Sequence, residues 1–438
     1  MQLHDLFFTP VYFILILLFA HQIRPRVTNQ ETEKYFLPAL SLKMLGAIGL
    51  GLIYTFHYRG GDTINFFNDA IRLSENIWTD TSNTLRVLFR IDHVIDDSFL
   101  RIRKGIWYYK DPPSYFIVQI ITIINLFCFD SYGAVSVVFG ALSFSGVWLL
   151  YYSFCLLKTH LYKVFAYIVL FLPSMIFWGS GILKDSITLG AMGWLFWSCY
   201  NMIYQKVTPM YLLLGFISSF ILIKVKIYVI LCFLPVATYW FFLEKTNFKN
   251  KNIKYFARPF ALVIGLAISF LALQKLSESS DKYNFDNITR TATVTANWLS
   301  HVSKTQGGSG YQLSGTFDGS LSSFFSLAPQ ALNVTYFRPY LWEARNPVML
   351  LAAIESLLCL LIFMWTFVLL LKNGFRQIFK APSFVIISFI FAALFGIAIG
   401  ISTYNFGSLV RYKLPALPFF LCSLIVIIDM RSNFFKKF

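Results

Sequence analysis

The sequence has few charged residues for a chain of its length. Of 438 residues, only 13% are Asp, Glu, Lys or Arg, whereas 57% are hydrophobic. Soluble domains carry about 25% charged residues, so a soluble fold is excluded. The six cysteines form no CxxC pair and show no metal-ligand spacing, which excludes a disulfide scaffold and argues against a cysteine-bound metal.

Acidic residues are the scarcer of the two charged kinds. The chain has 37 Lys and Arg against 21 Asp and Glu, a net charge of +16. In a soluble protein this excess would favour a nucleic-acid partner. Here six loops between apolar runs carry 16 Lys and Arg against three Glu and account for most of the net charge, which is the bias of cytoplasmic loops in membrane proteins. No nucleic acid is therefore expected as a partner, and membrane lipid is.

Long apolar runs are abundant. A membrane-spanning helix needs about 20 mostly apolar residues. Runs of this kind occur at 8–21, 37–57, 134–157, 163–178, 185–204, 209–223, 227–242, 257–275, 347–371, 383–402 and 414–429. They predict an all-α polytopic membrane protein with about 11 transmembrane helices. The first run lacks a basic flank before it and a small-residue cleavage site after it, so we interpret it as a retained helix.

The loops between the runs predict the orientation. Six are basic and are assigned to the cytoplasm: 22–36, 158–163, 205–208, 243–256, 372–382 and 430–438. The run 115–128 is only 14 residues long, and a crossing there would invert every later loop, so we expect an interfacial helix. The resulting segments are 1–57 (two spans), 58–133 (first outer loop), 134–275 (helix bundle), 276–346 (second outer loop) and 347–438 (C-terminal spans).

Three aspartates are candidates for chemistry on the outer face. Asp62 follows Gly60-Gly61 directly after the second span, and Asp69 lies seven residues later, on the same face of a helix if 63–75 is helical. Asp185 lies in the short turn between the fourth and fifth spans. Asp62 and Asp185 would also suit helix capping, and Asp185 could pair with Lys184. The functional alternative is that Asp62 and Asp185 face one outer cavity.

Five cations occupy outer turns where topology does not call for them: Lys184, Lys224, Lys226, Arg411 and Lys413. Each could extend towards lipid headgroups. Arginine also binds phosphate oxygens with two parallel hydrogen bonds. Their occurrence on the same face as Asp62 indicates a phosphate-bearing lipid.

The order of these motifs resembles the GT-C superfamily of polytopic glycosyltransferases. Asp62 matches the acidic residue early in that family's first outer loop, and 111–115 (Asp-Pro-Pro-Ser-Tyr) resembles its Pro-Pro-x-Tyr stretch. Pro173 and Asp185 fit a second acidic position after a Pro-containing helix. The segment 411–415 (Arg-Tyr-Lys-Leu-Pro) resembles an ending found in bacterial members and in polysaccharide polymerases. The chain departs from the family in an extra helix before Asp62 and in lacking a paired Asp-Glu.

The resemblance implies transfer of a sugar from a polyprenyl-phosphate-linked donor to an acceptor hydroxyl. The setting would be the outer face of a bacterial inner membrane, in cell-envelope glycan assembly, with a glycan, lipid or protein as acceptor. Asp62 would be the general base. Arg411, with Lys413 or Lys184, would neutralise the departing phosphate. Asp69 and Asp185 would orient the acceptor or bind Mg²⁺ or Mn²⁺ together with Asp62.

Other functions fit parts of the pattern. An O-antigen or exopolysaccharide polymerase or ligase would act from the second outer segment, with His301, Arg338 and Arg411 as its main residues. That segment contains Gly307-Gly308-Ser309-Gly310 and is either a lid over the cavity or a plain loop. A flippase or transporter of lipid-linked substrates would use the same cations without needing Asp62. A structural subunit of a membrane complex is the remaining alternative.

Overall fold

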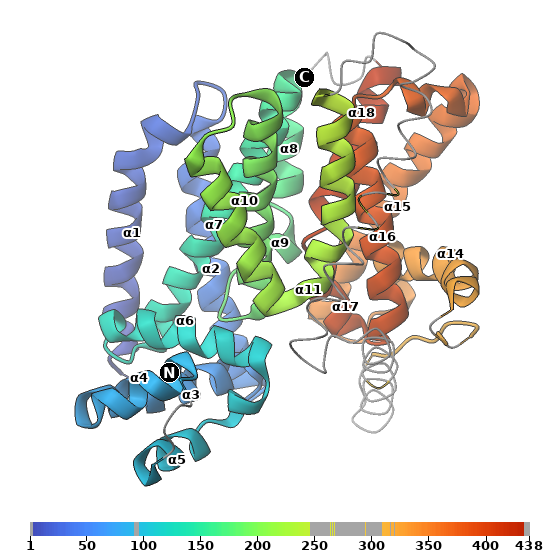
Figure 1. Cartoon of the computed structure of the whole chain (residues 1–438). Coiled ribbons are helices and arrows are strands. Elements are labelled where there is room, and N and C mark those ends of the chain that lie inside the picture. Colours follow the sequence, from blue (N-terminus) through green and yellow to red (C-terminus); the bar gives the residue numbers. More distant parts are fainter. Residues whose placement is uncertain are drawn as a thin grey trace.

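The computed structural model describes residues 3–91, 96–245 and 309–432, apart from 316 and 319, together with the single residues 263, 265, 267 and 294. Secondary structure in this part of the chain is helical, with one isolated bridge between Gly310 and Asn405. The long helices run side by side, and a group of shorter helices lies across one end (Figure 1).

Six of the described helices are long and apolar enough to cross a membrane, or seven if a bent pair counts as one span. The six are α1 (Asp5–Val27), α2 continued by a π-helical turn η1 (Glu33–Leu52 and Ile53–His57), α7 (Tyr132–Leu157), α11 (Pro209–Lys245), α15 (Pro347–Asn373) and α16 (Ser383–Thr403). The bent pair is α17 (Phe406–Tyr412) and α18 (Leu417–Arg431), at 68° to each other. The helix α10 (Lys184–Tyr204) lies among them. This is the architecture of an integral membrane protein.

The described residues do not confirm the expected count of about 11 spans. The run 163–178 is no continuous helix but two short ones, α8 (Tyr162–Val169) and α9 (Pro173–Phe177). Pro173 explains the break, because proline disfavours a helical conformation in the residue before it and has no N–H to continue the ladder. The run 257–275 falls outside the continuously described residues. A short 3₁₀ turn, η3 (Thr159–Leu161), precedes α8, and another, η6 (Phe375–Lys380), follows α15.

The two runs 209–223 and 227–242 form the two arms of α11. Lys226 has non-helical backbone angles, φ −147° and ψ 80°, and the chain reverses there. Before the reversal, the carbonyl of Tyr211 accepts a hydrogen bond from Ser198, near the end of α10. After it, Trp240 lies 3.4 Å from the hydroxyl of Tyr204, at the same end of α10. The first arm is therefore antiparallel to α10 and the second arm parallel to it.

The loops with excess basic charge meet at one end of the bundle, which we call the basic end. The turns around 28–32, 158–161, 205–208 and 374–382 lie there, as does the end of α18 (Figure 1). At the opposite end, the far end, α6 (Pro112–Cys128) lies across the long helices, as expected for an interfacial element. It contacts α7 and α11.

Further short helices extend the far end. They are α3 (Asp62–Thr79), α4 (Thr81–Phe89), α5 (Asp97–Lys104), the 3₁₀ turn η2 (Trp107–Lys110), α14 (Leu321–Phe337) and the 3₁₀ turn η5 (Leu341–Glu343). The helix α3 packs on α6, α4 on α3, and α5 on α4. These contacts make a second, smaller core with Phe66, Phe99 and Tyr115 fully buried.

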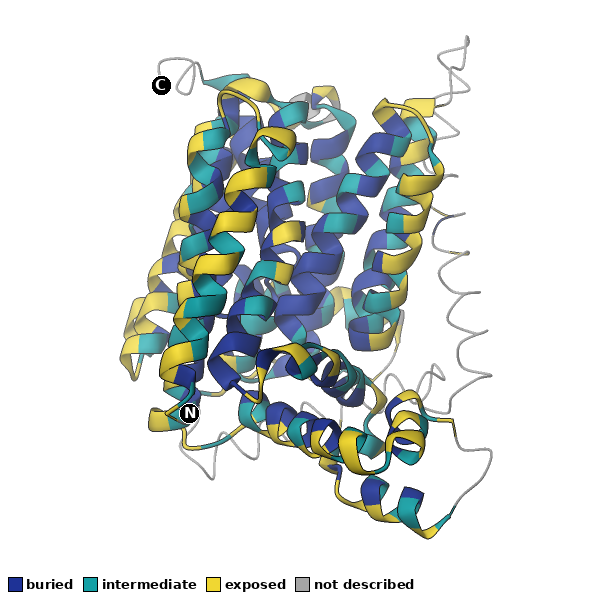
Figure 2. Ribbon diagram, turned by 90° about the vertical axis from the view of Figure 1, so that its left-hand side faces the viewer, coloured by how far each residue is buried: buried dark blue, intermediate teal, exposed yellow. Residues whose placement is uncertain are grey.

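The long helices have apolar residues both inside the bundle and on its outer surface, as expected for helices in lipid. Buried residues line the inside of the bundle, whereas exposed faces cover its outside (Figure 2). The exposed faces of α1 and α15 are themselves apolar, with Leu15, Phe19, Leu351 and Leu361 all more than half exposed. Large apolar surfaces of this kind indicate contact with the membrane.

Small residues let α7 and α10 approach closely. A Cβ atom placed on Gly146 of α7 would lie 1.9 Å from the carbonyl oxygen of Gly190, and one on Gly193 equally close to that of Gly146. Neither contact leaves room for a methyl group. Glycine is therefore required at this crossing, as in many membrane helix pairs.

We expect Gly146→Ala to destabilise the bundle, because the added methyl group must push α7 away from α10. Overpacking of this kind costs about 1–3 kcal/mol. The control is Gly49→Ala in α2, where a Cβ atom would meet its nearest neighbour, Phe177, at 4.0 Å. Thermal unfolding in detergent should show a lower Tm for Gly146→Ala than for Gly49→Ala. Equal Tm values would contradict the close crossing.

Candidate functional site

A network of buried charges lies at the far end, and Arg411 is at its centre. Its guanidinium donates from Nε to Asp185 Oδ2 at 3.1 Å and from Nη2 to Asp62 Oδ2 at 3.2 Å. Its Nη1 lies 3.4 Å from the hydroxyl of Tyr54. One arginine thus joins α17 to the start of α10, to the start of α3 and to η1.

The second cation of this network is Lys226. Its ammonium group pairs with Oδ1 of Asp185, so both oxygens of that carboxylate have a cationic partner. It also lies 4.1 Å from the centre of the Tyr412 ring, a cation–π contact. Two carboxylates and two cations cancel in charge. We call Asp62, Asp185, Lys226 and Arg411 the charge network.

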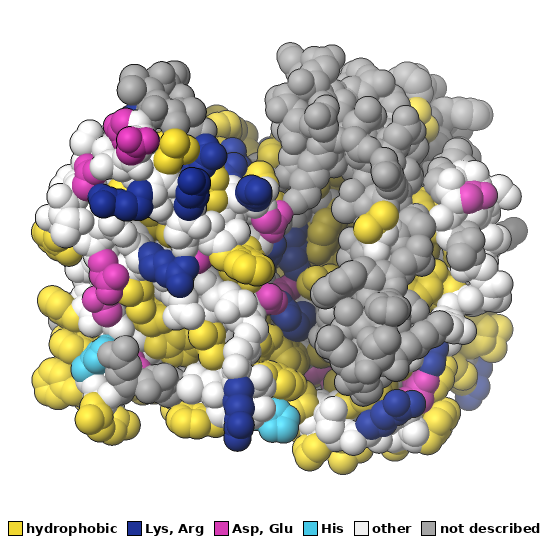
Figure 3. Space-filling view, turned by 90° about the horizontal axis from the view of Figure 1, so that it is seen from below, with side chains coloured by type: hydrophobic (Ala, Val, Ile, Leu, Met, Phe, Trp, Pro, Cys, Tyr) yellow, Lys and Arg dark blue, Asp and Glu magenta, His cyan; other side chains and the backbone are white. Residues whose placement is uncertain are grey.

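The four members differ in their access to solvent. The side chains of Asp185 and Lys226 are 1% and 7% exposed, and that of Arg411 is 16% exposed. Asp62 is 49% exposed. The network therefore runs from the protein interior to the surface, and acidic and basic side chains are visible in the hollow near the centre of the far end (Figure 3). A ligand that arrives from solvent meets Asp62 first and Arg411 next.

The local sequence explains why these side chains meet. Gly60 and Gly61 have φ values of 151° and 110°, which let the chain turn sharply from η1 into α3. A Cβ atom on Gly61 would lie 2.9 Å from the Tyr54 ring. Asp62 and Asp185 both lie in the first turns of their helices, where the helix dipole favours a carboxylate. Lys226 reaches Asp185 because α11 reverses at that residue.

The structure places the remaining aspartate elsewhere. Asp69 is buried and accepts hydrogen bonds from the backbone N–H groups of Trp107 and Tyr108, at 3.1 and 2.9 Å. Burial raises the pKa of Asp69, although these N–H donors act in the opposite direction. Its carboxylate holds η2 against α3.

The other predicted cations lie outside the charge network. Lys184 pairs with Asp111 at 3.3 Å. Lys413 is fully buried, and its ammonium group lies 3.4 Å from the hydroxyl of Ser356. Lys224 is exposed, 5.6 Å from the centre of the Phe220 ring.

Residues of the second outer segment are placed only in part. Arg338 forms a bidentate pair with Glu343, with Nε 3.0 and 3.1 Å from the two carboxylate oxygens, and lies 5.1 Å from the centre of the Phe406 ring. His301 and Gly307-Gly308 lie outside the described residues, so the interpretation of 276–346 as a lid or a plain loop stays a prediction.

Several polar residues of the interior were not predicted. Glu355 in α15 accepts hydrogen bonds from the backbone N–H of Ser174, at 3.1 Å, and from its hydroxyl, at 2.7 Å. Lys43 in α2 donates to the carbonyl of Met175 at 2.7 Å. The two charged side chains thus hold two neighbouring residues of α9. A single charged residue inside an otherwise apolar run was the available signal, because such residues are costly in a membrane.

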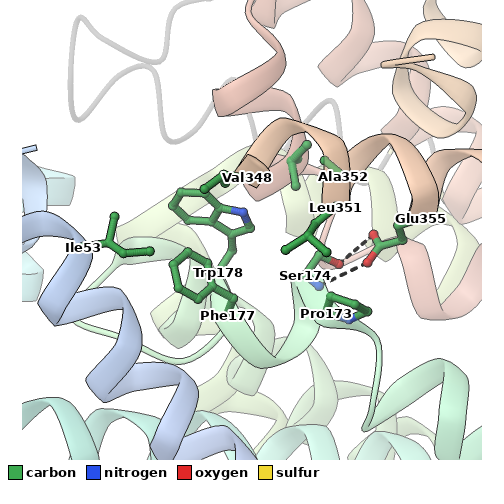
Figure 4. Close-up of a pocket in the computed structure, with 10 residues that line it drawn as sticks. Ile53, Pro173, Ser174, Phe177, Trp178, Val348, Leu351, Ala352 and Glu355 are labelled. Carbon is green, nitrogen blue, oxygen red and sulfur yellow. Dashed lines mark hydrogen bonds between the residues drawn. The ribbon is translucent and has the colours of Figure 1, made fainter. Parts of the chain in front are cut away.

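An apolar cavity of about 140 Å³ lies beside the charge network (Figure 4). Its walls come from η1, α9, the first turns of α15, and α17, and include Ile53, Phe177, Trp178, Val348, Leu351 and Val410. Glu355 and Ser174 are its polar residues. The ring of Trp178 lies 5.9 Å from the Arg411 guanidinium, so this residue separates the cavity from the network.

The predicted divalent cation needs a set of oxygen ligands. In the part of the chain that the structure describes, no three His, Cys, Asp or Glu side chains are grouped to hold a metal ion. Asp62 and Asp185 contact the same guanidinium, and Asp69 is used by η2. Since the three carboxylates are not brought together, we derive no step through a metal.

We expect Asp185→Asn to destabilise the fold strongly, because it leaves Lys226 and Arg411 without a buried counter-charge. Loss of one partner from a buried ion pair costs about 3–5 kcal/mol. Adding Lys226→Met should recover part of this loss, since it removes one of the unpaired charges. Chemical unfolding in detergent measures both effects.

The matched control for this experiment is Lys224→Met. It removes an exposed lysine that lies two residues before Lys226 in the sequence. It should change the free energy of unfolding by less than about 0.5 kcal/mol. If Asp185→Asn proved no more destabilising than Lys224→Met, the charge network would not be a structural element.

The chain was also compared with known proteins. No family model, curated protein or solved structure matches it. Its function is therefore inferred from its own residues and their geometry.

Proposed function

We propose that the chain is a membrane glycosyltransferase similar to the GT-C superfamily. It would move a sugar from a polyprenyl-phosphate-linked donor to an acceptor hydroxyl at the far end, in bacterial cell-envelope glycan assembly. The observation that carries this proposal is the shared contact of Arg411 with Asp62 and Asp185. It joins a phosphate-binding side chain to an accessible carboxylate, and the residues come from distant parts of the sequence.

Asp62 has the position of a general base. It is the most exposed member of the charge network, so an acceptor hydroxyl has access to it. A base must lie within hydrogen-bond reach of the proton that it removes. A donor phosphate that takes the guanidinium of Arg411 would free an oxygen of Asp62 to accept that proton.

Arg411 would stabilise the leaving group. The acceptor oxygen attacks the anomeric carbon while Asp62 takes its proton. The bond between that carbon and the phosphate oxygen breaks, and its electron pair stays on the phosphate. A preorganised cation near that oxygen stabilises the developing charge, and this term is commonly the largest in such catalysis. Direct displacement inverts the anomeric centre.

The cavity beside Trp178 suits the apolar part of the donor. It lies between helices, its walls are apolar, and it is one side chain away from Arg411. A lipid-linked phosphate needs this combination, an apolar space next to a cation. The orientation of the charge network towards the end opposite the basic loops supports activity on the extracytoplasmic side.

The polymerase or ligase alternative relies on His301, Arg338 and Arg411. Of these, Arg338 is paired with Glu343. That pair would have to open before Arg338 could bind a phosphate. A flippase would bind the donor through the same cations but would need no base, so it differs from a transferase in its dependence on Asp62.

We expect Asp62→Asn to lower glycosyl transfer at least about 100-fold, because it removes the base while keeping the shape of the side chain. The assay measures transfer of labelled sugar from a panel of polyprenyl-phosphate-linked hexoses in membranes that contain the protein. Donor binding, measured separately, should persist in the variant.

The matched control is Glu75→Gln, an exposed carboxylate on the same helix, outside the charge network. Its transfer rate should remain within about twofold of the unaltered protein. Full transfer by Asp62→Asn would refute the proposal, and lipid translocation by this variant without any transfer would favour the flippase.

A further inference from the structure

The far end carries a strongly basic, aromatic segment that the charge network does not use. Residues 97–110 contain four basic residues, Arg101, Arg103, Lys104 and Lys110, against one acidic residue, Asp97. Arg101, Lys104 and Lys110 are exposed, and Trp107 is 80% exposed. We call α5 together with η2, residues 97–110, the basic platform. Basic side chains are spread over this half of the far end in Figure 3.

The platform is held rigidly on α3, the helix that begins with Asp62. The carboxylate of Asp69 fixes the backbone of Trp107 and Tyr108. The Tyr108 ring packs on Phe66, with ring centres 4.6 Å apart. An exposed tryptophan is thus held in place by a buried carboxylate.

The platform leads to Asp62. The hydroxyl of Tyr108 forms a hydrogen bond with the side chain of Asn65, one turn after Asp62. Burial raises the pKa of Tyr108 to about 12. Asn65 and Asp62 lie three residues apart in α3, so their side chains share one face of that helix. A ligand that rests on Trp107 and extends past Tyr108 would reach the proposed base.

Stacked arginines strengthen the positive charge of this region. The guanidinium of Arg103 lies 5.7 Å from the centre of the Tyr109 ring, and that of Arg90 lies 5.0 Å from the same ring, on which both stack. Arg90 also lies 4.8 Å from the centre of the Tyr115 ring. Stacking fixes the guanidinium groups while they keep their charge. A surface with an excess of fixed positive charge attracts ligands of the opposite sign.

The α5 part of the platform lies away from the long helices, whereas η2 contacts α6 directly. Contacts run from the long helices to α6, then to α3, α4 and α5, and α5 is the lowest helix in Figure 1. A helix with its side chains is about 10 Å across. Two helical layers therefore separate α5 from the ends of the long helices, which favours a ligand in the aqueous space.

We propose that the basic platform binds the acceptor, and that the acceptor is an acidic glycan, with carboxylate or phosphate groups on its sugars. The inference rests on the proposed function and adds the class of acceptor to it. Trp107 offers an aromatic face for a sugar ring, and Arg101, Lys104 and Lys110 pair with the acidic groups. The chain of sugars then passes Tyr108, and its terminal hydroxyl meets Asp62.

The test measures binding of tetragalacturonate, an acidic probe, to the full chain in detergent by calorimetry. We expect Trp107→Ala to weaken binding about tenfold, because the aromatic face is lost. Trp107→Phe should restore most of it. The matched control is Trp78→Ala, which removes a tryptophan of equal exposure at the other end of α3 and should change the affinity less than twofold.

Charge is tested in the same assay. Arg101→Gln with Lys104→Gln should weaken binding about tenfold and reduce its dependence on salt, since both exposed charges act through solvent. Neutral maltotetraose should bind at least about tenfold more weakly than tetragalacturonate. Equal affinity of Trp107→Ala and Trp78→Ala, or no binding of tetragalacturonate, would overturn the inference.

Two further results separate the interpretations. Quenching of Trp107 fluorescence by brominated lipids, measured as the difference between the unaltered protein and Trp107→Ala in vesicles, would show a membrane contact and overturn the inference. Transfer that depends on Asp62, with probe binding independent of Trp107, would refute the acceptor site alone. Probe binding that depends on Trp107, without any transferase activity, would refute the proposed function alone.

Discussion

The contact of one guanidinium with two carboxylates organises the far end. A buried ion without a partner costs several kcal/mol, so neither Asp185 nor Arg411 is stable in the interior alone. Their pairing fixes the start of α10 relative to α17, and the contact with Asp62 adds the start of α3. Lys226 balances the charge and lies at the point where α11 reverses. The positions of four helices thus depend on one group of charges.

Irregular backbone is concentrated at the same place. The Gly60-Gly61 turn, the reversal at Lys226 and the bend between α17 and α18 all border the charge network. In a membrane, non-helical backbone is tolerated only where it is buried in protein or lines a polar cavity, because its N–H and C=O groups need partners. The network supplies this polar environment. The ion pairs and the breaks in the helices therefore occur together at the far end.

Much of this arrangement follows from the sequence. Apolar runs and basic loops predicted the long helices and their common basic end, and the length of 115–128 predicted a helix lying across them. Charged outer turns predicted one site with Asp62, Asp185 and five cations, and the structure joins Asp62 and Asp185 to two of these cations, Lys226 and Arg411. Lys413 follows the end of α17 and lies near the hydroxyl of Ser356 in α15, a contact between distant residues that the sequence pattern does not reveal. Asp69 has the spacing expected for the same helix face as Asp62. Its carboxylate, however, accepts a hydrogen bond from the backbone of η2, a contact between distant residues that spacing does not reveal.

The side chains of the charge network differ in solvent exposure, and this difference indicates which of them stabilise the fold and which are accessible to a ligand. Asp185 and Lys226 are almost fully buried, so their charges act on the fold and on the position of Arg411. Asp62 is half exposed, and solvent already compensates much of its charge, so its removal costs the fold less than the removal of Asp185. Under the proposed function, chemistry would take place at the accessible end, where a ligand can replace the contact of Asp62 with Arg411, and the buried end would stabilise the fold. Arg411 touches both, and a ligand that binds its guanidinium therefore acts on Asp62 while Asp185 keeps the arginine in place.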